Sequence, residues 1–354
     1  MRRSRDRVGG YRGRRTLTDH LRVIAGVLAV LVVLALAGLF FGQKYIFYTD
    51  GGVRLHLPFF SQKKDDLPDV GDVSVVEKPK EATGDGSDTS AAQPAEETGT
   101  KYITLPLSAL EDGTAEQQLH EAGADGAVLE VKDREGRLAW HSDQALAAYD
   151  GVNGPEANND LLRQWTQKGY PTAALVNCFR DNAVPYHRNS LALRTSGGNW
   201  RDENRLRWLD PANEEAQNYL AGLVGELAAL GFDEIVLNCA AFPTQGNVDQ
   251  ITNAPEDRAA AVRQFLTQAE QAAAPYGAKV SLCTDRAALT EQTEISGLTL
   301  TDLSSGTLGL WLETAEGEED AILWLTNHKL LDRAVLLTDA FAADCPAGQA
   351  VAES

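Results

Sequence analysis

Acidic and amide side chains lie at or just after the ends of a series of short apolar runs between residues 101 and 354. They are Glu130, Asp133, Asp181, Asn238, Asp285, Asp302 and Glu313. Hydrolysis of a glycoside needs two carboxyl groups, one protonated and one ionised. Asp285, Asp302 and Glu313 are the candidates for such a pair. An acid that follows a strand also caps the next helix, so each of them has a structural interpretation as well.

A second group of side chains could hold a carbohydrate without reacting with it. It comprises Glu130, Lys132, Asp133, Asp181, Asn238, Trp200, Trp208 and Trp311. Indole rings offer flat faces that suit sugar rings, and they equally often pack a loop onto its domain. Trp200 and Trp208 fall in the long segment 182–209, and a loop of that length without structure of its own is usually functional or disordered.

The elements that must position these residues alternate between strand and helix patterns. The β-rich runs are Tyr102–Leu107, Ala127–Val131, Ala173–Phe179, Glu234–Cys239, Lys279–Cys283, Gly297–Thr301, Thr307–Leu312 and Arg333–Thr338. Helical patterns cover Thr114–Ala122, Asn158–Lys168, Asn213–Leu230, Pro255–Ala274 and Ala315–Leu331, and Asp210-Pro211 is the expected start of the third of them.

This order predicts an α/β fold of the (β/α)8 TIM-like barrel type over residues 101–354. Strands separated by helices form parallel sheets, and eight strands fit the usual size of about 250 residues for this barrel. A doubly wound open sheet is the alternative. No G-x-G-x-x-G follows a strand, which weakens any dinucleotide-binding interpretation. The active site of a barrel lies at the C-terminal ends of its strands, where the acids fall.

No metal or cofactor is expected. Cys178, Cys239 and Cys283 lie near the ends of three successive strands, but neither a CxxC nor a Cys/His spacing for zinc is present. Free buried cysteine is the simplest interpretation.

Charge is distributed unevenly along the 354 residues, whose formal net charge is −19. Residues 1–22 carry eight arginines and two aspartates, residues 61–100 carry ten acids and four lysines, and residues 101–354 sum to −20. An acidic body argues against nucleic acid as a partner, because a general nucleic-acid binder needs a basic footprint.

Residues 23–41 form an apolar run without a charge, long enough for a transmembrane helix. The arginines of the basic tail 1–22 precede it, which predicts a cytoplasmic N-terminus, a single-pass protein of the cell membrane and an extracytoplasmic body. A cleaved signal peptide, with Ala35-Leu36-Ala37 as the cleavage site, is the alternative and also exports the body. A buried core helix fits less well beside so many arginines.

Two further segments separate this run from the barrel. Residues 42–60 hold Asp50-Gly51-Gly52 between short alternating runs, which predicts a juxtamembrane hairpin. Residues 61–100 lack aromatics and are rich in charged and small residues, so we expect a disordered acidic linker.

Trp208–Pro243 reads WLDPANEEAQNYLAGLVGELAALGFDEIVLNCAAFP, and GAVLEVKDREG, ALVNCFRD and GAKVSLCTD begin at residues 126, 174 and 277. These segments resemble a bacterial family known as putative glycoside hydrolases, a domain family of unknown function with a predicted TIM barrel. Its pattern runs Trp-Val-(Asp/Asn)-Pro, a helix, then Gly-Phe-Asp-Glu-Ile-Gln-Phe-Asp-Tyr-Val-Arg-Phe-Pro. The resemblance covers most of 101–285.

The chain departs from the family pattern at the fourth strand. Asn238 replaces the family's Asp, Cys239 and Ala241 replace its Tyr and Arg, and Leu175 replaces an Arg of the third strand. The family's Pro-Met-x-Tyr-Pro element near strand seven is absent, and GLWLET stands there. If the resemblance makes that Asp a nucleophile or base, Asn238 cannot replace it, because an amide does not ionise at a useful pKa.

Three functions follow from these observations. The first is an anchored, catalytically impaired barrel that binds cell-wall or environmental glycans. The second is an active glycosidase that uses Glu313 with Asp285 or Asp302. The third is an envelope scaffold that binds a protein partner.

Overall fold

The computed structural model describes residues 46–49, 52–55, 99–314 and 317–351. The chain divides into two compact units, residues 1–88 and 89–354. In the first unit, β1 (Ile46–Thr49) and β2 (Gly52–Leu55) pair antiparallel at the position of the expected hairpin. The basic tail 1–22, the apolar run 23–41 and nearly all of the linker 61–100 lie outside the described residues. Within the described part, no helix is long and apolar enough to cross a membrane.

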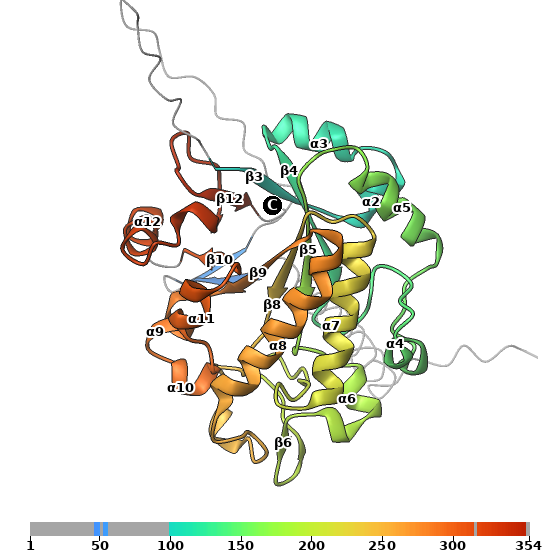
Figure 1. Cartoon of the computed structure of the whole chain (residues 1–354), viewed down its shortest axis with the longest axis vertical. Helices are drawn as coiled ribbons and strands as arrows, with labels where there is room; N and C mark the ends of the chain where they lie inside the picture. Colours follow the sequence, from blue (N-terminus) through green and yellow to red (C-terminus); the bar gives the residue numbers. More distant parts are fainter. Residues whose placement is uncertain (1–45, 50–51, 56–98, 315–316, 352–354) are drawn as a thin grey trace, which may run out of the picture. The chain divides into compact units, whose positions relative to one another are not determined.

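The second unit is a closed barrel of eight parallel strands (Figure 1). In order around the barrel they are β3 (Lys101–Leu105), β4 (Gly126–Lys132), β5 (Thr172–Asn177), β8 (Glu234–Asn238), β9 (Lys279–Thr284), β10 (Gly309–Glu313), β11 (Ala334–Thr338) and β12 (Gly348–Val351). The last strand pairs with the first, Gln349 opposite Lys101. The predicted (β/α)8 barrel is therefore confirmed, and the open doubly wound sheet is excluded.

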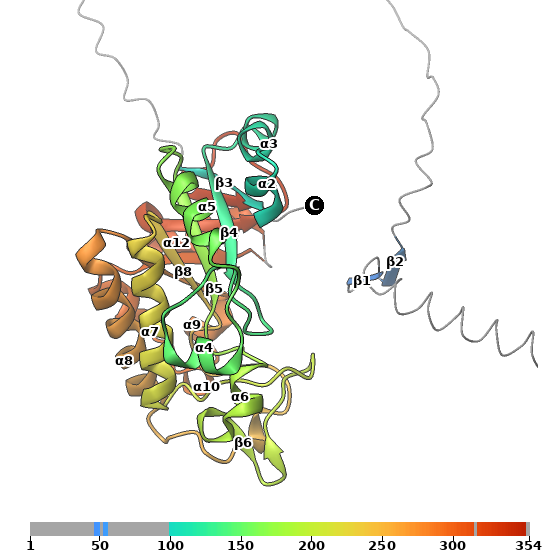
Figure 2. The same ribbon diagram turned by 90° about the vertical axis from the view of Figure 1, so that its right-hand side faces the viewer.

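Helices surround this barrel on the outside (Figure 2). The longer ones are α3 (Ala115–Ala122), α5 (Ala157–Thr166), α7 (Glu214–Ala229), α8 (Arg258–Ala273) and α12 (Glu318–Asn327), each close to a predicted helical pattern. Shorter ones are α2 (Leu107–Glu111), α4 (Ala145–Asp150), α9 (Arg286–Thr290), α10 (Thr293–Ser296) and α11 (Leu300–Ser305). Helices α7 and α8 lie side by side, with α7 against β8 and α8 against β9 (Figure 1).

The start of α7 differs from the prediction. Its N-cap is Asn213, whose side chain accepts a hydrogen bond from the backbone N–H of Ala216. Asp210 instead accepts from the N–H of Ala212 in the turn before the helix. The Asp-Pro pair therefore forms the approach to the helix, and the cap falls three residues later.

The predicted sixth strand, Gly297–Thr301, is wrong. Gly297 ends α10 in the left-handed conformation at φ 77°, and Thr299 caps α11 by accepting from the N–H of Asp302. The alternating pattern of this segment thus belongs to a turn and a helix start. The predicted seventh and eighth strands are the sixth and seventh of the barrel, and the eighth, β12, was not predicted.

Every strand contributes one buried hydrophobic side chain to a cluster inside the barrel. These side chains are Tyr102, Val128, Ala173, Val236, Cys283, Trp311, Val335 and Ala350. A larger apolar core lies between the strands and the helices. The barrel is therefore packed along its axis, as in other barrels of this type, and space for a ligand remains at its mouth.

The long segment between β5 and α7 has structure of its own. This insert, residues 178–213, holds α6 (Val184–His187), a 3-10 turn (Asn189–Leu191) and the hairpin β6 (Arg194–Thr195) and β7 (Gly198–Asn199). An isolated antiparallel bridge between Arg180 and Trp208 joins its two ends, and a bridge between Arg201 and Arg207 closes a loop in its later part.

Candidate functional site

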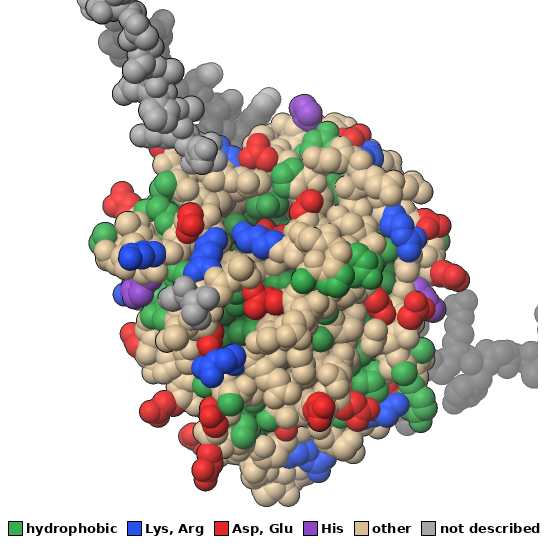
Figure 3. Space-filling model, viewed as in Figure 1, with side chains coloured by type: hydrophobic (Ala, Val, Ile, Leu, Met, Phe, Trp, Pro, Cys, Tyr) green, Lys and Arg blue, Asp and Glu red, His purple; other side chains and the backbone are tan. Residues whose placement is uncertain are grey.

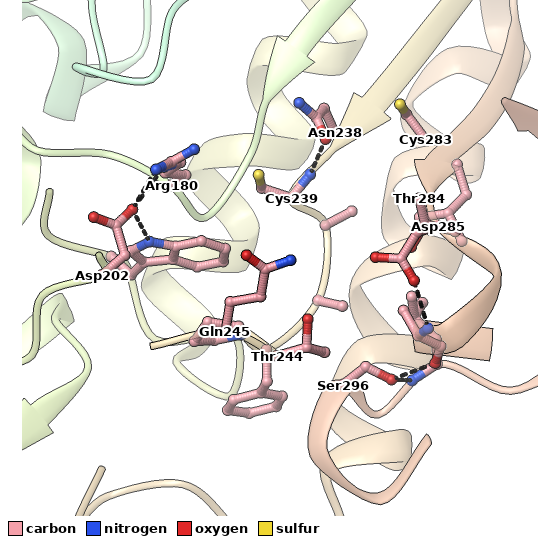
Figure 4. Close-up of a pocket in the computed structure, with 18 of the residues that line it drawn as sticks. Arg180, Asp202, Asn238, Cys239, Thr244, Gln245, Cys283, Thr284, Asp285 and Ser296 are labelled. Carbon is pink, nitrogen blue, oxygen red and sulfur yellow. Dashed lines mark hydrogen bonds and ion pairs between the residues drawn. The ribbon is translucent and has the colours of Figure 1, made fainter. Parts of the chain in front are cut away.

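A cleft of about 350 Å³ lies at the C-terminal ends of β8, β9 and β10. Its lining includes Arg134 from the segment after β4, Arg180, Asp202, Glu203 and Trp208 from the insert, Asn238–Gln245 after β8, Cys283–Asp285 at the end of β9, and Glu313 at the end of β10. A second cavity of about 300 Å³ shares Gln245, Asp285 and Glu313 with it. Figure 4 shows Gln245 between the Arg180–Asp202 side and the Asp285 side. The structure thus places the cleft at the expected end of the barrel.

Two predicted catalytic acids, Asp285 and Glu313, line both cavities. The Glu313 side chain is open to solvent on one side and packed against protein on the others. This partial burial, and to a lesser extent the negative charge of Asp285, raises the pKa of Glu313 above its ordinary value. Asp285 caps α9, with Oδ1 accepting from the N–H of Ala288 at 2.8 Å. One acid with a raised pKa therefore lies near a second carboxylate.

Asn238 faces the cleft, but its amide is already bonded within the protein. Its Nδ2 donates to Oδ1 of Asn177 at 3.0 Å, and its Oδ1 accepts from the backbone N–H of Cys239 at 2.9 Å. Asn177 in turn donates to Oε1 of Glu130 at 2.8 Å. Cys239 adopts a left-handed backbone conformation at φ 50°, which is uncommon outside glycine. A chain of hydrogen bonds thus runs from Glu130 on β4 to the turn after β8.

Lys132 and Asp181 were predicted to bind substrate, and the structure contradicts this, because both side chains are fully buried. Lys132 Nζ lies 2.9 Å from Asp181 Oδ2 and donates to the carbonyl of Asn177 at 2.7 Å. Asp181 Oδ1 accepts from the N–H groups of Ala183 and Val184. This buried pair ties the end of β4 to the start of the insert.

Two other predicted binding residues from β4 and its following turn lie outside the cleft lining. Asp133 Oδ1 accepts from the N–H of Arg137 and closes the turn after β4. Glu130 is exposed and holds the Asn177 amide described above. Both therefore have local structural roles.

Of the three tryptophans predicted to bind substrate, two are buried away from the cleft and one lines it. Trp200 is 1% exposed and donates from Nε1 to the carbonyl of Asn247, so it packs the insert onto the next loop. Trp311 is 2% exposed inside the barrel, where Nε1 donates to Glu234 Oε1. Neither can contact a ligand in the cleft, and both predictions are corrected. Trp208 does line the cleft, with Nε1 donating to Asp202.

Asp302, the third predicted catalytic acid, also lies away from the cleft. It sits in the first turn of α11, where its Oδ1 accepts from Arg263 Nε of α8 at 2.6 Å. The prediction placed it at the end of a sixth strand, and that strand is absent. The pair of acids available to the cleft is therefore Asp285 and Glu313.

Sequence reasoning missed the cations of the cleft. Arg180 Nε donates to Asp202 Oδ2 at 2.7 Å, and Asp202 also accepts from Trp208. Arg134 lines the same space. Arg180 directly follows the third predicted strand, so the rule that strand ends carry the site would have found it had basic residues been considered.

The four cysteines are unpaired thiols. Cys239 and Cys283 line the cleft, and burial raises the pKa of the Cys239 thiol to about 11 and that of Cys283 further. Both therefore remain protonated at neutral pH and are weak nucleophiles. Among the described residues, no group of histidine, cysteine and acidic side chains has the arrangement of a metal site.

Many solved structures are similar to this chain, among them the following three. A hypothetical protein from Ruminiclostridium thermocellum is 22% identical over 51% of this chain and 96% of its own, with a TM-score of 0.45. The GH20 exo-β-N-acetylglucosaminidase of Vibrio harveyi is 11% identical over 68% and 41%, with a TM-score of 0.49. The PgaB (BpsB) glycoside hydrolase domain of Bordetella bronchiseptica is 13% identical over 68% and 84%, with a TM-score of 0.48.

No curated protein matches the chain. A family model described as "Putative glycosyl hydrolase domain" matches residues 115–300, which include β4 to β9, the insert and most of the cleft. The resemblance that the sequence motifs indicated is thereby confirmed, and the chain belongs to this family of glycosyl hydrolase-like domains.

Proposed function

We propose that the barrel binds a glycan in the cleft at its mouth and that the catalytic role of the fourth strand has been lost. The observation that carries this proposal is the state of Asn238, which faces the cleft and has both its amide donor and its amide oxygen bonded to the protein. An amide cannot act as a general base or take up a glycosyl group as a carboxylate does.

The cleft has the composition of a carbohydrate site. Arg180, Gln245 and Glu313 supply donors and acceptors for sugar hydroxyls, and Trp208 forms part of the wall. Its volume of about 350 Å³ lies within the range of ligand pockets, roughly 300–1,000 Å³. Membership of a glycosyl hydrolase-like family supports the same ligand class.

Hydrolysis by Glu313 and Asp285 is the second candidate. The raised pKa of Glu313, caused by burial and by Asp285, favours the protonated carboxyl that a general acid needs. Asp285 would then serve as the ionised partner. This route bypasses Asn238 and uses two acids that line the same cleft.

The N-terminal segments complete the proposal. The apolar run 23–41 would anchor the protein in the cell membrane, with the basic tail inside and the barrel outside. In intact cells, added protease should then remove the barrel, and alkaline carbonate should leave the protein in the membrane fraction. Release by carbonate, or protection from protease, would contradict the anchor or its orientation.

The function is tested with full-length protein in mild detergent, as wild type, Glu313→Gln, Asn238→Asp and Asp302→Asn. Each is assayed for binding to peptidoglycan, teichoic acid and a glycan panel, and for release of reducing ends. We expect wild type to bind without hydrolysis. Asp302→Asn removes an acid outside the cleft and is the matched control.

The outcomes separate the candidates. Hydrolysis by wild type that Glu313→Gln abolishes and the control retains would replace the impaired barrel with the second candidate. Hydrolysis gained by Asn238→Asp would identify position 238 as the lost catalytic group. Inert glycans, together with a stoichiometric envelope protein in a pull-down, would overturn both candidates in favour of a scaffold.

A further inference from the structure

Another cavity, on the insert, is lined by arginines and by no acidic residue. This arginine pocket, about 540 Å³, is lined by Tyr186, Asn189, Arg194, Thr195, Gly197, Gly198, Asn199, Arg201 and Arg207. None of these residues lines the cleft at the barrel mouth. Residues 101–354 sum to −20, and Figure 3 shows acidic side chains spread over the visible face. Three arginines in a lining free of carboxylates thus contrast with the acidic balance of this domain.

Neutral oxygens hold each of the three guanidinium groups. Arg194 donates to the Asn189 carbonyl at 3.2 Å and to Asn199 Oδ1 at 3.1 Å. Arg201 donates to the carbonyl of Arg205 at 2.8 Å. These bonds fix the direction of each side chain and leave its positive charge uncompensated.

Arg207 is held in the same manner, by Asn182 Oδ1 at 2.8 Å. No salt bridge joins Arg194, Arg201 or Arg207 to an acid among the described residues. Glu135 lines the adjacent cavity, which Arg207 also borders, and its carboxylate accepts from Asn182.

The backbone explains why these arginines share one side of the insert. Arg201 and Arg207 face each other in an antiparallel bridge, and such partners project to the same side of the ribbon. Their neighbours Asp202 and Trp208 are buried and line the cleft. Burial and the charge of Arg201 lower the pKa of Arg207, as expected where two guanidinium groups lie close together.

We propose that the arginine pocket binds the anionic group of a charged sugar, a carboxylate or a phosphate ester, at a site separate from the cleft. Guanidinium groups match both oxyanions through paired N–H donors. Tyr186, 61% exposed with Arg207 4.7 Å from its ring, offers an aromatic surface for the sugar itself. The negative charge of the domain opposes a dense polyanion such as nucleic acid.

Calorimetric titration of the full-length protein in mild detergent at low salt tests the proposal. The ligands are glucuronate, glucose 1-phosphate and glucose. We expect one or both anionic sugars to bind, glucose not to bind at this site, and added salt to weaken the binding. Preference between the two anions distinguishes a carboxylate ligand from a phosphate ligand.

Arg207→Gln and Arg201→Gln should each weaken binding of the anionic sugar about tenfold or more, because each removes a charged hydrogen-bond donor. Arg163→Gln is the matched control, since Arg163 is an exposed arginine of α5 whose one acidic partner in the described part of the chain is Asp160. Arg201 is exposed, and its side chain bonds one carbonyl among the described residues, so its variant stays informative if Arg207→Gln unfolds. Glu313→Gln should leave this binding unchanged, which separates it from the cleft.

Three results would overturn the proposal. They are equal binding of glucose and the anionic sugars, an effect of Arg163→Gln as large as that of Arg207→Gln, and tighter binding of a thymidine oligonucleotide than of either anionic sugar.

Discussion

The two halves of the barrel mouth differ in what their polar groups do. On the β4, β5 and β8 side, which we call the bonded half, hydrogen bonds join Lys132 to Asn177 and Asn177 to Asn238. On the β9 and β10 side, Asp285 and Glu313 line the cleft, and the protein disfavours the charged form of Glu313. The bonded half stabilises the barrel mouth, and the other half, which we call the reactive half, retains carboxyl groups available for chemistry.

The difference has a physical cause. A polar group without water must find its partners within the protein, and the bulge in β4 between Glu130 and Lys132 brings a buried ammonium group against the end of β5. Position 238 lies in this bonded half, so an amide with two fixed partners suits it. The substitution at this position thus fits a structural role.

The largest expected effect comes from Lys132→Ala. It leaves Asp181 as a buried carboxylate without its cation, which should lower the free energy of unfolding by about 3–5 kcal/mol in urea titration. Lys168→Ala removes a lysine whose pair with Glu116 is exposed and should cost at most about 1 kcal/mol. Equal losses of unfolding free energy in both variants would mean that the buried Lys132–Asp181 pair contributes no more to stability than an exposed pair.

Asn177→Ala should have the next largest effect. It removes the amide that links Glu130, the Lys132 carbonyl and Asn238, and the unsatisfied groups should cost about 1–3 kcal/mol of unfolding free energy. The control is Asn159→Ala, which breaks two hydrogen bonds to His141 at the surface. A smaller loss for Asn177→Ala than for the control would contradict the claim that the hydrogen bonds of the bonded half stabilise the barrel mouth.

Asp302→Asn should cost about 1 kcal/mol or less in thermal unfolding, because the Arg263 partner is more than half exposed. Glycan binding should not change, since Asp302 lies outside the cleft. A change in glycan binding would mean that Asp302 contributes to the site and that the reactive half includes residues beyond β9 and β10.

Glu313→Gln should produce the smallest effect, and one of opposite sign. Because the folded-state pKa of Glu313 is raised, its contribution to stability is present below the unfolded-state pKa and is lost as pH rises through the folded-state value. The neutral variant should therefore melt higher than wild type at neutral pH and equally at acidic pH. A difference in melting temperature that does not depend on pH would contradict the raised pKa.

The sequence predicts the barrel and the position of its mouth because both follow from the order of elements. Glu313 and Asp285 lie at the mouth for this reason. Whether a side chain reaches the mouth depends on its depth along the strand as well as on the side it faces, and a single apolar run does not reveal this depth. Trp311 is two residues before Glu313 and therefore on the same side of β10, but it lies deeper, inside the packed barrel, whereas Glu313 lines the mouth.

Two errors in the strand count come from competing local effects. Gly297–Thr301 alternates like a strand, but the Thr299 side chain can cap a helix, and that capping decides its structure. The true last strand, β12, is only four residues long and begins with glycine, so its own sequence is a weak strand former. Its pairing with β11 and β3 supplies what the sequence lacks.

The pairing of Gln349 with Lys101 has a consequence for how the protein is made. The first strand of the barrel must wait for nearly the whole domain to be synthesised before its second neighbour exists. Until then β3 and β11 both present an open edge, the kind of surface that invites aggregation. Closure of the ring joins residues far apart in the chain, so folding should be slow and completed only after synthesis has passed β12.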